Sequence, residues 1–561
     1  MMTLDIGTSD SICTRLAKRA TNWSRGCIGC LAMVLGLASG VSFGGDPAVM
    51  NGSLPDEIKQ ILTKPRYDGA VWGLRVVDLD SGEVVYDLNS DRQLLIGSVR
   101  KLFSVGLALE ALGPGYVFRT PVYAQGRIHH GRVLDGDLVL VASGDLAMGG
   151  RTNPDGTYAI SNFDHNEANA LGNAVLTAPD PLGGYEAIAA QVAASGIKRV
   201  MGDVIIDDRL FEPFNFRDEF ELRPIFVNDD VVDVIMSPGR IGARADVDWR
   251  PHSAAFHVHS RLRTAPAGEA FELELDPELP DCIGAKRCAG TVSGSLPIDF
   301  VPPLTARFPL VRTFRIVEPA NYARTVLIEA LGRAGVSVNA RAVAPNRVGR
   351  LPAPDAYLSW TKVAELVSLP YRDYAKHIMK VSYNIGADTS LLLFGLTKSA
   401  SNMRGALAAE RETLAREFDI QASTVHFIDG SGGGDTTATS PAVTKLLREM
   451  SRRSSFADYF DAQPRLGVDG SLSFVTDFEA DPTLAGAKGQ VHAKTGTFVK
   501  PTDRGPVLKT QALAGYIIAK SGRRFAFMLA VNDAGVISGI NDVIPVFQDQ
   551  GTIAAILWKL L

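Results

Sequence analysis

The chain has 561 residues, of which 46% are hydrophobic, so it can bury more than one core and we expect two or more domains. Its formal net charge is −5 and its pI is about 6.0. These values, together with the lack of any long run of like charge, argue against a nucleic-acid-binding domain and against a charged tail.

The first 44 residues differ from the remainder. Basic residues at positions 15, 18, 19 and 25 precede an uncharged, mostly apolar stretch over residues 27–43, and Ser42 and Gly44 supply small residues for cleavage. This pattern is typical of a secretory signal peptide with a long leader, which we predict over residues 1–44. The apolar stretch is borderline in length for a membrane span, so an uncleaved anchor is the alternative. In both cases we expect an exported, periplasmic or envelope-associated protein.

Residues 71–78 and 84–88 alternate apolar and polar side chains around a turn, which predicts a β-hairpin. Apolar positions then recur up to residue 112, where a Gly-Pro-Gly sequence ends the pattern. We therefore predict a buried helix over residues 98–112, with Ser98 at its N-terminus and Lys101 one turn along the same face.

Residues 119–349 contain short strands, many turns and few helices, as expected for one or two inserted α/β or β-rich domains. The pattern predicts a helix at 185–194, a strand at 199–206, a helix at 320–334 and a strand at 336–343. Three of the five cysteines lie in the leader, and the remaining two are Cys282 and Cys288. An even pair in an exported chain favours a disulfide that closes a small loop, with two free thiols as the alternative.

A helical pattern runs from residue 360 to residue 396, with an interruption near Ser382. Residues 429–434 read as a flexible glycine-rich loop. We then predict a strand at 490–497, a hairpin of residues 512–518 and 525–531, and a closing helix at 541–561. Strands at both ends that flank helices indicate an α/β (α+β) domain with an antiparallel sheet, interrupted by the insert. The predicted division is 45–118, 119–349 and 350–561.

Three short motifs follow one another along the chain. Ser98 and Lys101 form S-x-x-K, Ser382 and Asn384 form S-x-N, and residues 494–496 form K-T-G. Each motif alone is weak, because S-x-x-K recurs at residues 195–198 and S-x-N at 337–339. Those copies fall at a predicted turn and a predicted surface strand. The order of the three motifs is typical of the serine acyl-transferases that react with penicillins.

A serine hydroxyl becomes a nucleophile only when a base takes its proton. We interpret Ser98 as the nucleophile and Lys101 as the base, since burial and nearby positive charge lower the pKa of a lysine from about 10.4. The helix N-terminus and Lys494 are the expected sources of that charge. Taken alone, Ser98 could be a helix cap and Lys101 a solvated side chain, but the later motifs favour catalysis.

Ser382 is expected to pass a proton between Lys101, Lys494 and the leaving group. Asn384 is expected to hold the substrate's peptide bond and Lys101. Without the other motifs, Ser382 and Asn384 would be ordinary turn residues.

The K-T-G motif is expected to bind substrate. Lys494 and Thr495 would present a cation and a hydroxyl to a carboxylate, and Gly496 would leave room for a substrate along the strand edge. The backbone N–H groups of Ser98 and Thr497 would form the oxyanion hole. No cofactor and no metal are needed for this chemistry.

With these residues the chain resembles the penicillin-binding D-alanyl-D-alanine carboxypeptidases of the peptidase S13 family, over residues 60–561. Further matches lie at residues 136–140, 143–145, 429–432, 467–472 and 513–516. The resemblance implies a transpeptidase-like domain of the serine β-lactamase and penicillin-binding-protein fold with a large insert. It implies cleavage of the terminal D-Ala-D-Ala bond of peptidoglycan stem peptides, often with D,D-endopeptidase action, and acylation by β-lactams.

The chain departs from that family at four places. Tyr383 stands where many members have Asp, residues 433–435 replace a usual Leu-Ser-Arg, and Ser471 replaces a usual Thr. Residues 212–250 do not match the family's side-chain recognition segment. These departures leave the acylation residues intact and leave the choice of substrate open.

Three other functions compete. A β-lactamase shares the motifs but has a much shorter gap between the first two and, in class A, a dedicated Glu. A non-catalytic peptidoglycan-binding scaffold would retain only a relict site. A zinc peptidase could use His252, His257 and His259, but no H-E-x-x-H motif is present.

Overall fold

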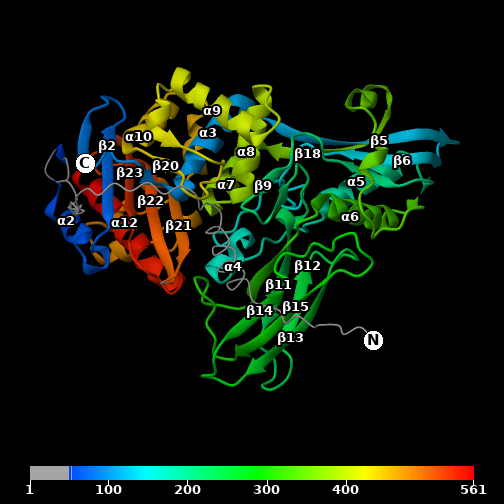
Figure 1. Cartoon of the computed structure of the whole chain (residues 1–561), viewed down its shortest axis with the longest axis horizontal. Coiled ribbons are helices and arrows are strands. Elements are labelled where there is room, and N and C mark those ends of the chain that lie inside the picture. Colours follow the sequence, from blue (N-terminus) through cyan, green and yellow to red (C-terminus); the bar gives the residue numbers. More distant parts are fainter. Residues whose placement is uncertain (1–49, 52–53, 504) are drawn as a thin grey trace, which may run out of the picture. The chain divides into compact units, whose positions relative to one another are not determined.

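The computed structural model describes residues 50–51, 54–503 and 505–561 (Figure 1). The predicted signal peptide lies outside these residues, and so do the three cysteines of the leader. Among the described residues, none of the helices combines the length and the apolar character that a bilayer span requires.

A six-stranded sheet joins the two ends of the described chain (Figure 1). All its neighbouring strands are antiparallel, so the predicted split sheet is confirmed. Both predicted hairpins are present, and the second is longer than expected. In spatial order the strands are β1 (Met50–Asn51), β3 (Val84–Leu88), β2 (Val71–Asp78), β23 (Arg524–Asn532), β22 (Gly505–Ile518) and β21 (Val491–Thr502).

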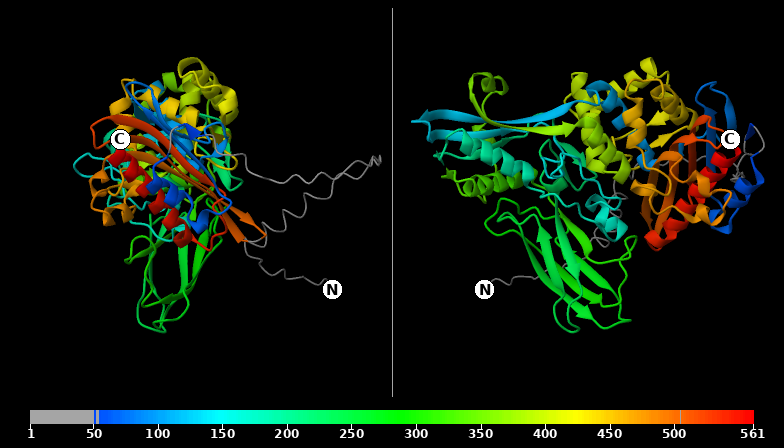
Figure 2. Two further views of the ribbon diagram at one scale, coloured as in Figure 1. Left: turned by 90° about the vertical axis from the view of Figure 1, so that its left-hand side faces the viewer. Right: turned by 180° about the vertical axis from the view of Figure 1, so that it is seen from behind.

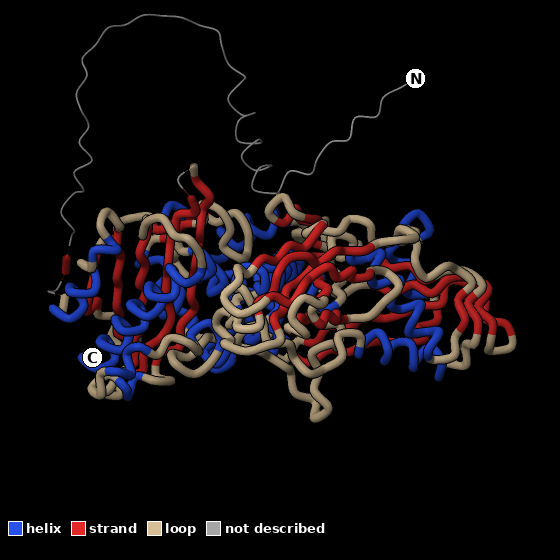
Figure 3. The backbone as a smooth tube through the Cα atoms, turned by 90° about the horizontal axis from the view of Figure 1, so that it is seen from below, coloured by secondary structure: helices blue, strands red, loops and turns tan. Residues whose placement is uncertain are grey.

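The two faces of this sheet pack on different helices because side chains alternate along each strand. Leu513 and Leu529 share a core with α2 (Asp56–Leu62) and α12 (Ile540–Leu560), the predicted closing helix. Ala514 and Met528 share another core with α3 (Lys101–Leu112) and α10 (Ser440–Met450). Figure 3 shows helices beside the strands. The second face therefore carries the first motif.

Further helices surround α3. They are α7 (Tyr371–Val381), α8 (Asn384–Thr397), α9 (Met403–Glu417) and α11 (Phe456–Ala462). A small sheet of β4 (Leu94–Leu95), β20 (Thr437–Ala438) and β19 (Val425–His426) lies beside them. The helix predicted over residues 98–112 is present with Ser98 at its N-terminal end, but its first turn is a 3₁₀ turn. Ser98 belongs to a 3₁₀ turn, Gly97–Arg100, in which Val99 N–H bonds the carbonyl of Ile96, and the α-helix begins at Lys101.

The inserted region contains a second sheet, of parallel and antiparallel strands, covered by two helices (Figure 2). Its strands are β5 (Val117–His129), β6 (Val133–Val141), β7 (Arg199–Val200), β8 (Val204–Asp207), β17 (Ser337–Val338) and β18 (Thr361–Pro370). The helices are α5 (Gly183–Ala194) and α6 (Pro319–Arg333), both as predicted.

The remainder of the insert is β-rich, as predicted. One sheet contains β11 (Val231–Ser237), β12 (Asp246–Arg250) and β16 (Leu310–Arg315), and another contains β13 (His257–Ala265), β14 (Glu272–Asp276) and β15 (Ala289–Pro297). A short hairpin of β9 (Phe214–Phe216) and β10 (Phe220–Leu222) and the one-turn helix α4 (Ala168–Leu171) complete it.

Three predicted elements differ from the structure. Residues 361–370 form strand β18 rather than a helix, because they pair with β5 and complete its sheet. The predicted strand at 199–206 is divided into β7 and β8, and between them the backbone N–H of Asp203 donates to the Asp137 carboxylate. The strand predicted at 336–343 is limited to β17.

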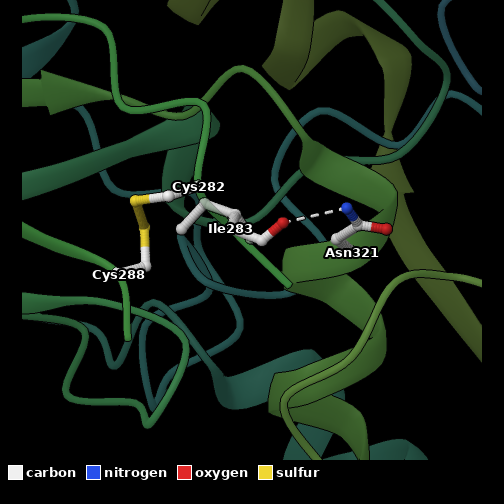
Figure 4. The surroundings of a disulfide bond; sticks show 4 residues. All are labelled: Cys282, Ile283, Cys288 and Asn321. Atoms are coloured by element: carbon white, nitrogen blue, oxygen red, sulfur yellow. Dashed lines mark hydrogen bonds between the residues drawn. A yellow bond between two sulfur atoms is a disulfide. The ribbon is translucent and has the colours of Figure 1, made fainter. Parts of the chain in front are cut away.

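The predicted disulfide is present. Cys282 and Cys288 are bonded at 2.00 Å, and between them the carbonyl of Ile283 accepts a hydrogen bond from Asn321 Nδ2 at 3.0 Å (Figure 4). Asn321 belongs to α6, so the small loop is attached to the helix that covers the second sheet.

Candidate active site

The first motif brings an amine directly to the Ser98 hydroxyl. Lys101 is fully buried at the start of α3, and its Nζ lies 2.6 Å from Ser98 Oγ. The turn that presents Ser98 requires a left-handed residue, which is Gly97 at φ 48°. The serine is therefore placed by backbone geometry and the amine by helix packing.

Lys101 has polar partners but no carboxylate partner among the described residues. Its Nζ lies 2.7 Å from Asn384 Oδ1, 3.3 Å from Ser382 Oγ and 3.0 Å from the carbonyl oxygen of Ser431. Burial, followed by the positive charge of Arg217, lowers the pKa of Lys101 to about 7. We had expected the helix N-terminus and Lys494 to supply this charge, and sequence reasoning missed Arg217, which belongs to no motif.

The second motif connects two helices and both lysines. Ser382 ends α7 in the left-handed conformation, with φ 63°, which is uncommon for a residue with a side chain. Its Oγ accepts a hydrogen bond from Lys494 Nζ at 2.9 Å and also lies near Lys101. Burial, followed by the charge of Lys101, lowers the pKa of Lys494. One hydroxyl thus bridges two buried amines.

Tyr383, the middle residue of this motif, explains how the chain tolerates a departure from the family pattern. It is buried in the hydrophobic core, and its ring lies 5.4 Å from the ring of His377. It does not line the cleft. An aromatic residue at this position therefore leaves the polar groups of Ser382 and Asn384 in place.

Asn384 starts α8 and uses both ends of its amide. Its Oδ1 faces Lys101, and its Nδ2 donates to Glu167 Oε1 at 2.7 Å. Glu167 belongs to the inserted region, at the end of the 3₁₀ turn His165–Glu167. No motif identifies Glu167, and sequence reasoning missed it. Because it is also a cleft residue, the insert supplies part of the site.

A buried network of charges holds the Glu167 turn. Arg151 donates to both oxygens of Asp164 at 2.8 Å and also to Asp229. His165 bridges Asp229 and Asp233 at 2.8 and 2.7 Å. Burial by itself would lower the pKa of His165. The neighbouring carboxylates, of which Asp233 has the largest effect, outweigh burial and raise this pKa to about 9, so the imidazole is cationic at neutral pH. The ion pairs and hydrogen bonds of this network hold Asp164 and His165, the residues just before Glu167, in place.

The zinc alternative is not supported by the positions of its histidines. His257 and His259 lie on β13 with exposed side chains, and His252 is also exposed. Among the described residues, three potential ligand atoms come within 4.8 Å of one another at Asp164, Asp229 and His377 instead. There Arg151 already occupies the carboxylates, so this group is part of the charged network.

The third motif lies on edge strand β21. Thr495 Oγ1 is 2.7 Å from Ser471 Oγ, so the Ser that replaces a usual Thr keeps a hydroxyl contact. Thr497 Oγ1 donates to Gln511 Oε1 at 2.7 Å. Lys494 Nζ also donates to the carbonyl of Thr495 at 2.7 Å. The strand thus carries a buried amine and two threonine hydroxyls, and both threonines line the cleft.

Gly496 does not serve the purpose we expected. A side chain at this position would lie 2.1 Å from the carbonyl oxygen of Ile96 and 2.8 Å from the N of Val99. The glycine therefore lets the strand approach the Ser98 turn, rather than making room for a substrate. A side chain at Gly97 would likewise lie 2.9 Å from the backbone N of Thr497. This approach places the N–H groups of Ser98 and Thr497 close together.

The loop that we expected to be flexible is held by hydrogen bonds. The Asp429 carboxylate accepts from the backbone N–H groups of Ser431, Gly432 and Gly433. A side chain at Gly432 would lie 2.1 Å from the carbonyl oxygen of Gly97. The loop is therefore packed directly against the Ser98 turn, and it delivers the Ser431 carbonyl to Lys101.

These groups open into a cleft of about 560 Å³. Its polar side contains Ser98, Ser382, Asn384, Glu167 and Arg217. Its apolar side is formed by side chains from the insert, from β21 and from α12 and the segment before it. They include Phe163, Leu171, Phe498, Ile540 and Phe547, and Phe474 from the segment before β21 joins them. A serine hydroxyl, a buried amine and a concave surface thus occur together, as expected for an acyl-transfer enzyme.

Comparison with known proteins agrees with this geometry. Residues 54–550 match the model of the D-Ala-D-Ala carboxypeptidase 3 (S13) family. The chain belongs to this family and is a serine-type carboxypeptidase, as predicted from its motifs.

Individual relatives cover most of the chain. A D-alanyl-D-alanine carboxypeptidase of Actinomadura sp. (strain R39) is 29% identical over 527 residues, which are 87% of this chain and 84% of the relative. The carboxypeptidase DacB of Haemophilus influenzae is 23% identical over 490 residues, 84% and 87% of the two chains. The crystal structure of penicillin binding protein 4 (dacB) from Haemophilus influenzae matches with a TM-score of 0.65 at 18% identity, over 90% of this chain and 99% of that one. This similarity establishes the predicted fold class.

Replacing Gly496 with Ala should separate the strand from the nucleophile turn. The added methyl group meets backbone atoms that cannot rotate away, so we expect the rate of acylation by penicillin to fall by about 100-fold. The rate is measured with a fluorescent penicillin. Gly332→Ala is the matched control, because no atom lies within 4 Å of a side chain at that helical position. Equal rates for the two variants would contradict the role we give to Gly496.

Proposed function

We propose that Ser98 forms the acyl-enzyme and that Lys101 is its general base. The neutral amine of Lys101 accepts the proton of Ser98 Oγ, and the oxygen attacks the carbonyl carbon of the terminal D-Ala-D-Ala bond. The observation that carries the proposal is the 2.6 Å contact between the two groups, in a buried site that lowers the pKa of the lysine to about 7.

The remaining steps use the other motif residues. The backbone N–H groups of Ser98 and Thr497 stabilise the oxyanion of the tetrahedral intermediate. Ser382 relays the proton from Lys101 to the nitrogen of the departing D-Ala as the C–N bond breaks, which leaves an ester on Ser98. Lys101 then takes a proton from a water molecule as the water oxygen adds to the ester carbonyl. The bond between the carbonyl carbon and Ser98 Oγ breaks, and Lys101 returns the proton to Oγ, which releases the shortened peptide and restores the serine and the neutral amine.

Lys494 and the hydroxyls of Thr495 and Thr497 anchor the terminal carboxylate of the substrate. Lys494 is buried, and its amine lies beside Ser382 rather than in solvent. Binding of an anion at this point favours the charged form of Lys494 and stabilises the complex. Asn384, held between Lys101 and Glu167, orients the peptide bond on the acyl side.

We infer that the ligands are peptidoglycan stem peptides, with β-lactams as acylating inhibitors. The structure of the Haemophilus influenzae protein has also been solved in complex with a β-lactam. The leader and the disulfide between Cys282 and Cys288 support an exported, periplasmic or envelope-associated protein. A peripheral attachment to membrane or cell wall belongs to the same proposal.

We also propose the three-part division of the chain into residues 45–118, 119–349 and 350–561. The shared six-stranded sheet supports one catalytic domain from the first and third parts. Strand β18, at 361–370, pairs with β5 and therefore lies on the sheet of the insert. The third part of this division thus begins with a strand of the insert's sheet, and its helices around α3 start at α7.

Labelling with penicillin tests the nucleophile. We expect a stable adduct on Ser98, identified by mass spectrometry, that is absent in Ser98→Ala. Lys101→Ala should slow its formation by about 1,000-fold, because the serine loses its base. The second S-x-x-K copy supplies a control, since Ser195 and Lys198 are both exposed. Ser195→Ala should label normally. An adduct at another residue, or normal labelling of Ser98 in Lys101→Ala, would contradict the assignment.

The natural substrate requires a separate test. Muropeptides that end in D-Ala-D-Ala should lose one D-Ala, detected by chromatography and mass spectrometry, and Ser98→Ala should leave them intact. Cleavage of cross-linked dimers in the same assay would add D,D-endopeptidase activity. Rapid hydrolysis of penicillin with no action on muropeptides would instead indicate a β-lactamase, and acylation by neither ligand would indicate a scaffold.

A further inference from the structure

Arg217 brings a positive charge into the cleft from outside the three motifs. It follows strand β9 in the hairpin with β10 and lines the cleft with Ser98 and Asn384. Its guanidinium carbon lies 4.9 Å from the centre of the Phe216 ring. Among the described residues, it makes no ion pair with a carboxylate. Its charge is therefore not neutralised by a direct partner.

The backbone of the hairpin is held in an unusual conformation to present this side chain. Arg217 and Asp218 both have left-handed backbones, with φ 53° and 60°, which residues with side chains rarely adopt. Asn215 and Asp218 stabilise the turn by two mutual hydrogen bonds of 3.0 Å. Such conformations persist where the surroundings impose them, and they are common at functional sites.

Arg217 is connected to the reacting groups through Ser431. Its Nη2 donates to Ser431 Oγ at 3.2 Å. The carbonyl oxygen of the same Ser431 receives Lys101 Nζ at 3.0 Å and Ser98 Oγ at 3.4 Å. The Ser431 side chain thus contacts Arg217, while the Ser431 backbone carbonyl contacts the Ser98 hydroxyl and the Lys101 amine.

We propose that Arg217 is a positioning residue for acylation, which holds Ser431 in place and sets a positive charge beside the amine of Lys101. This inference rests on the proposed roles of Ser98 and Lys101. It assigns to the insert a direct part in the activation of the nucleophile, in addition to forming a wall of the cleft.

The charges that face Lys101 come from five elements. The carboxylates of Glu167 in the insert, Asp388 on α8 and Asp429 in the glycine-rich loop raise its pKa. Arg217 lowers it, and Lys494 adds a second buried amine on the other side of Ser382. The insert therefore contributes one charge of each sign, Glu167 and Arg217, and the two should act in opposite directions.

The test is the pH dependence of acylation by a fluorescent penicillin. A lysine accepts a proton only when neutral, so the rate should rise with pH and reach half its maximum near pH 7 in the unmodified protein. In Arg217→Gln the ammonium form is favoured, and we expect this midpoint to move to higher pH by about half a unit or more. Acylation at pH 7 should fall accordingly.

Three further variants complete the experiment. Arg217→Lys keeps the charge and should restore the midpoint. Arg404→Gln removes an exposed arginine on α9 and should leave the midpoint unchanged. Glu167→Gln keeps a hydrogen-bond acceptor for Asn384 and should move the midpoint to lower pH. Glu167→Gln also tests the charge argument should Arg217→Gln fail to fold.

An unchanged midpoint in Arg217→Gln would overturn the inference, even if its apparent affinity for penicillin falls, because Arg217 would then be only a ligand contact. Failure of Arg217→Lys to restore the midpoint would also overturn it. The proposed function is tested separately in the same assay. Absence of an adduct on Ser98 in the unmodified protein would refute both ideas, whereas an adduct with unshifted profiles refutes only the role of Arg217.

Discussion

The account depends on one constraint, the burial of a lysine amine without a carboxylate beside it. Water stabilises an ammonium ion, and burial removes that stabilisation. Lys101 is fully buried, and its partners are two side-chain oxygens of other motif residues, the Ser98 hydroxyl and a carbonyl. These groups tolerate a neutral amine, whereas a carboxylate would hold the proton on it. The same environment that costs folding free energy therefore lowers the pKa of the lysine, as our proposal that Lys101 is the base requires.

Close backbone packing brings the three motifs to this amine. Gly496 on β21 and Gly432 in the Asp429 loop both lack side chains where the Ser98 turn passes, and the turn itself bends at Gly97. Hydrogen bonds between segments that are far apart in the sequence also hold this packing in place. Arg100, fully buried, donates to Glu410 on α9 and to the carbonyl of Asp429. The catalytic groups are thus positioned by rigid backbone and buried polar contacts.

The inserted region contributes two charged side chains to this site. Glu167 reaches the amide of Asn384, and Arg217 reaches the Ser431 side chain. The charged network around Arg151 fixes the first of these residues from inside the insert. A change in the insert can therefore alter the proton affinity of Lys101 as well as the shape of the cleft. Phe163 and Leu171 of the insert also form part of the apolar wall of the cleft.

Much of this arrangement could be predicted from the sequence because it is local or carried by motifs. The hairpins, the split sheet and the disulfide follow from alternation, turns and cysteine number, and the motif residues come together as expected. Glu167 and Arg217 could not be found, since each belongs to a segment of ordinary composition and meets its partner only through tertiary packing. The sequence suggested that Gly496 makes room for a substrate, but it could not show that the backbone of the Ser98 turn occupies that space. Strand β18 was missed because its pairing with β5 decides its conformation.

The most direct test of the central claim is the titration of the Lys101 amine itself. Lysine labelled with ¹³C at Cε reports the protonation of its amine by NMR, and Lys101→Ala identifies the signal. The account predicts a midpoint near pH 7 for Lys101 in the free protein. A midpoint near the ordinary lysine value of about 10.4 would show that the amine stays charged, and Lys101 could not then act as the base.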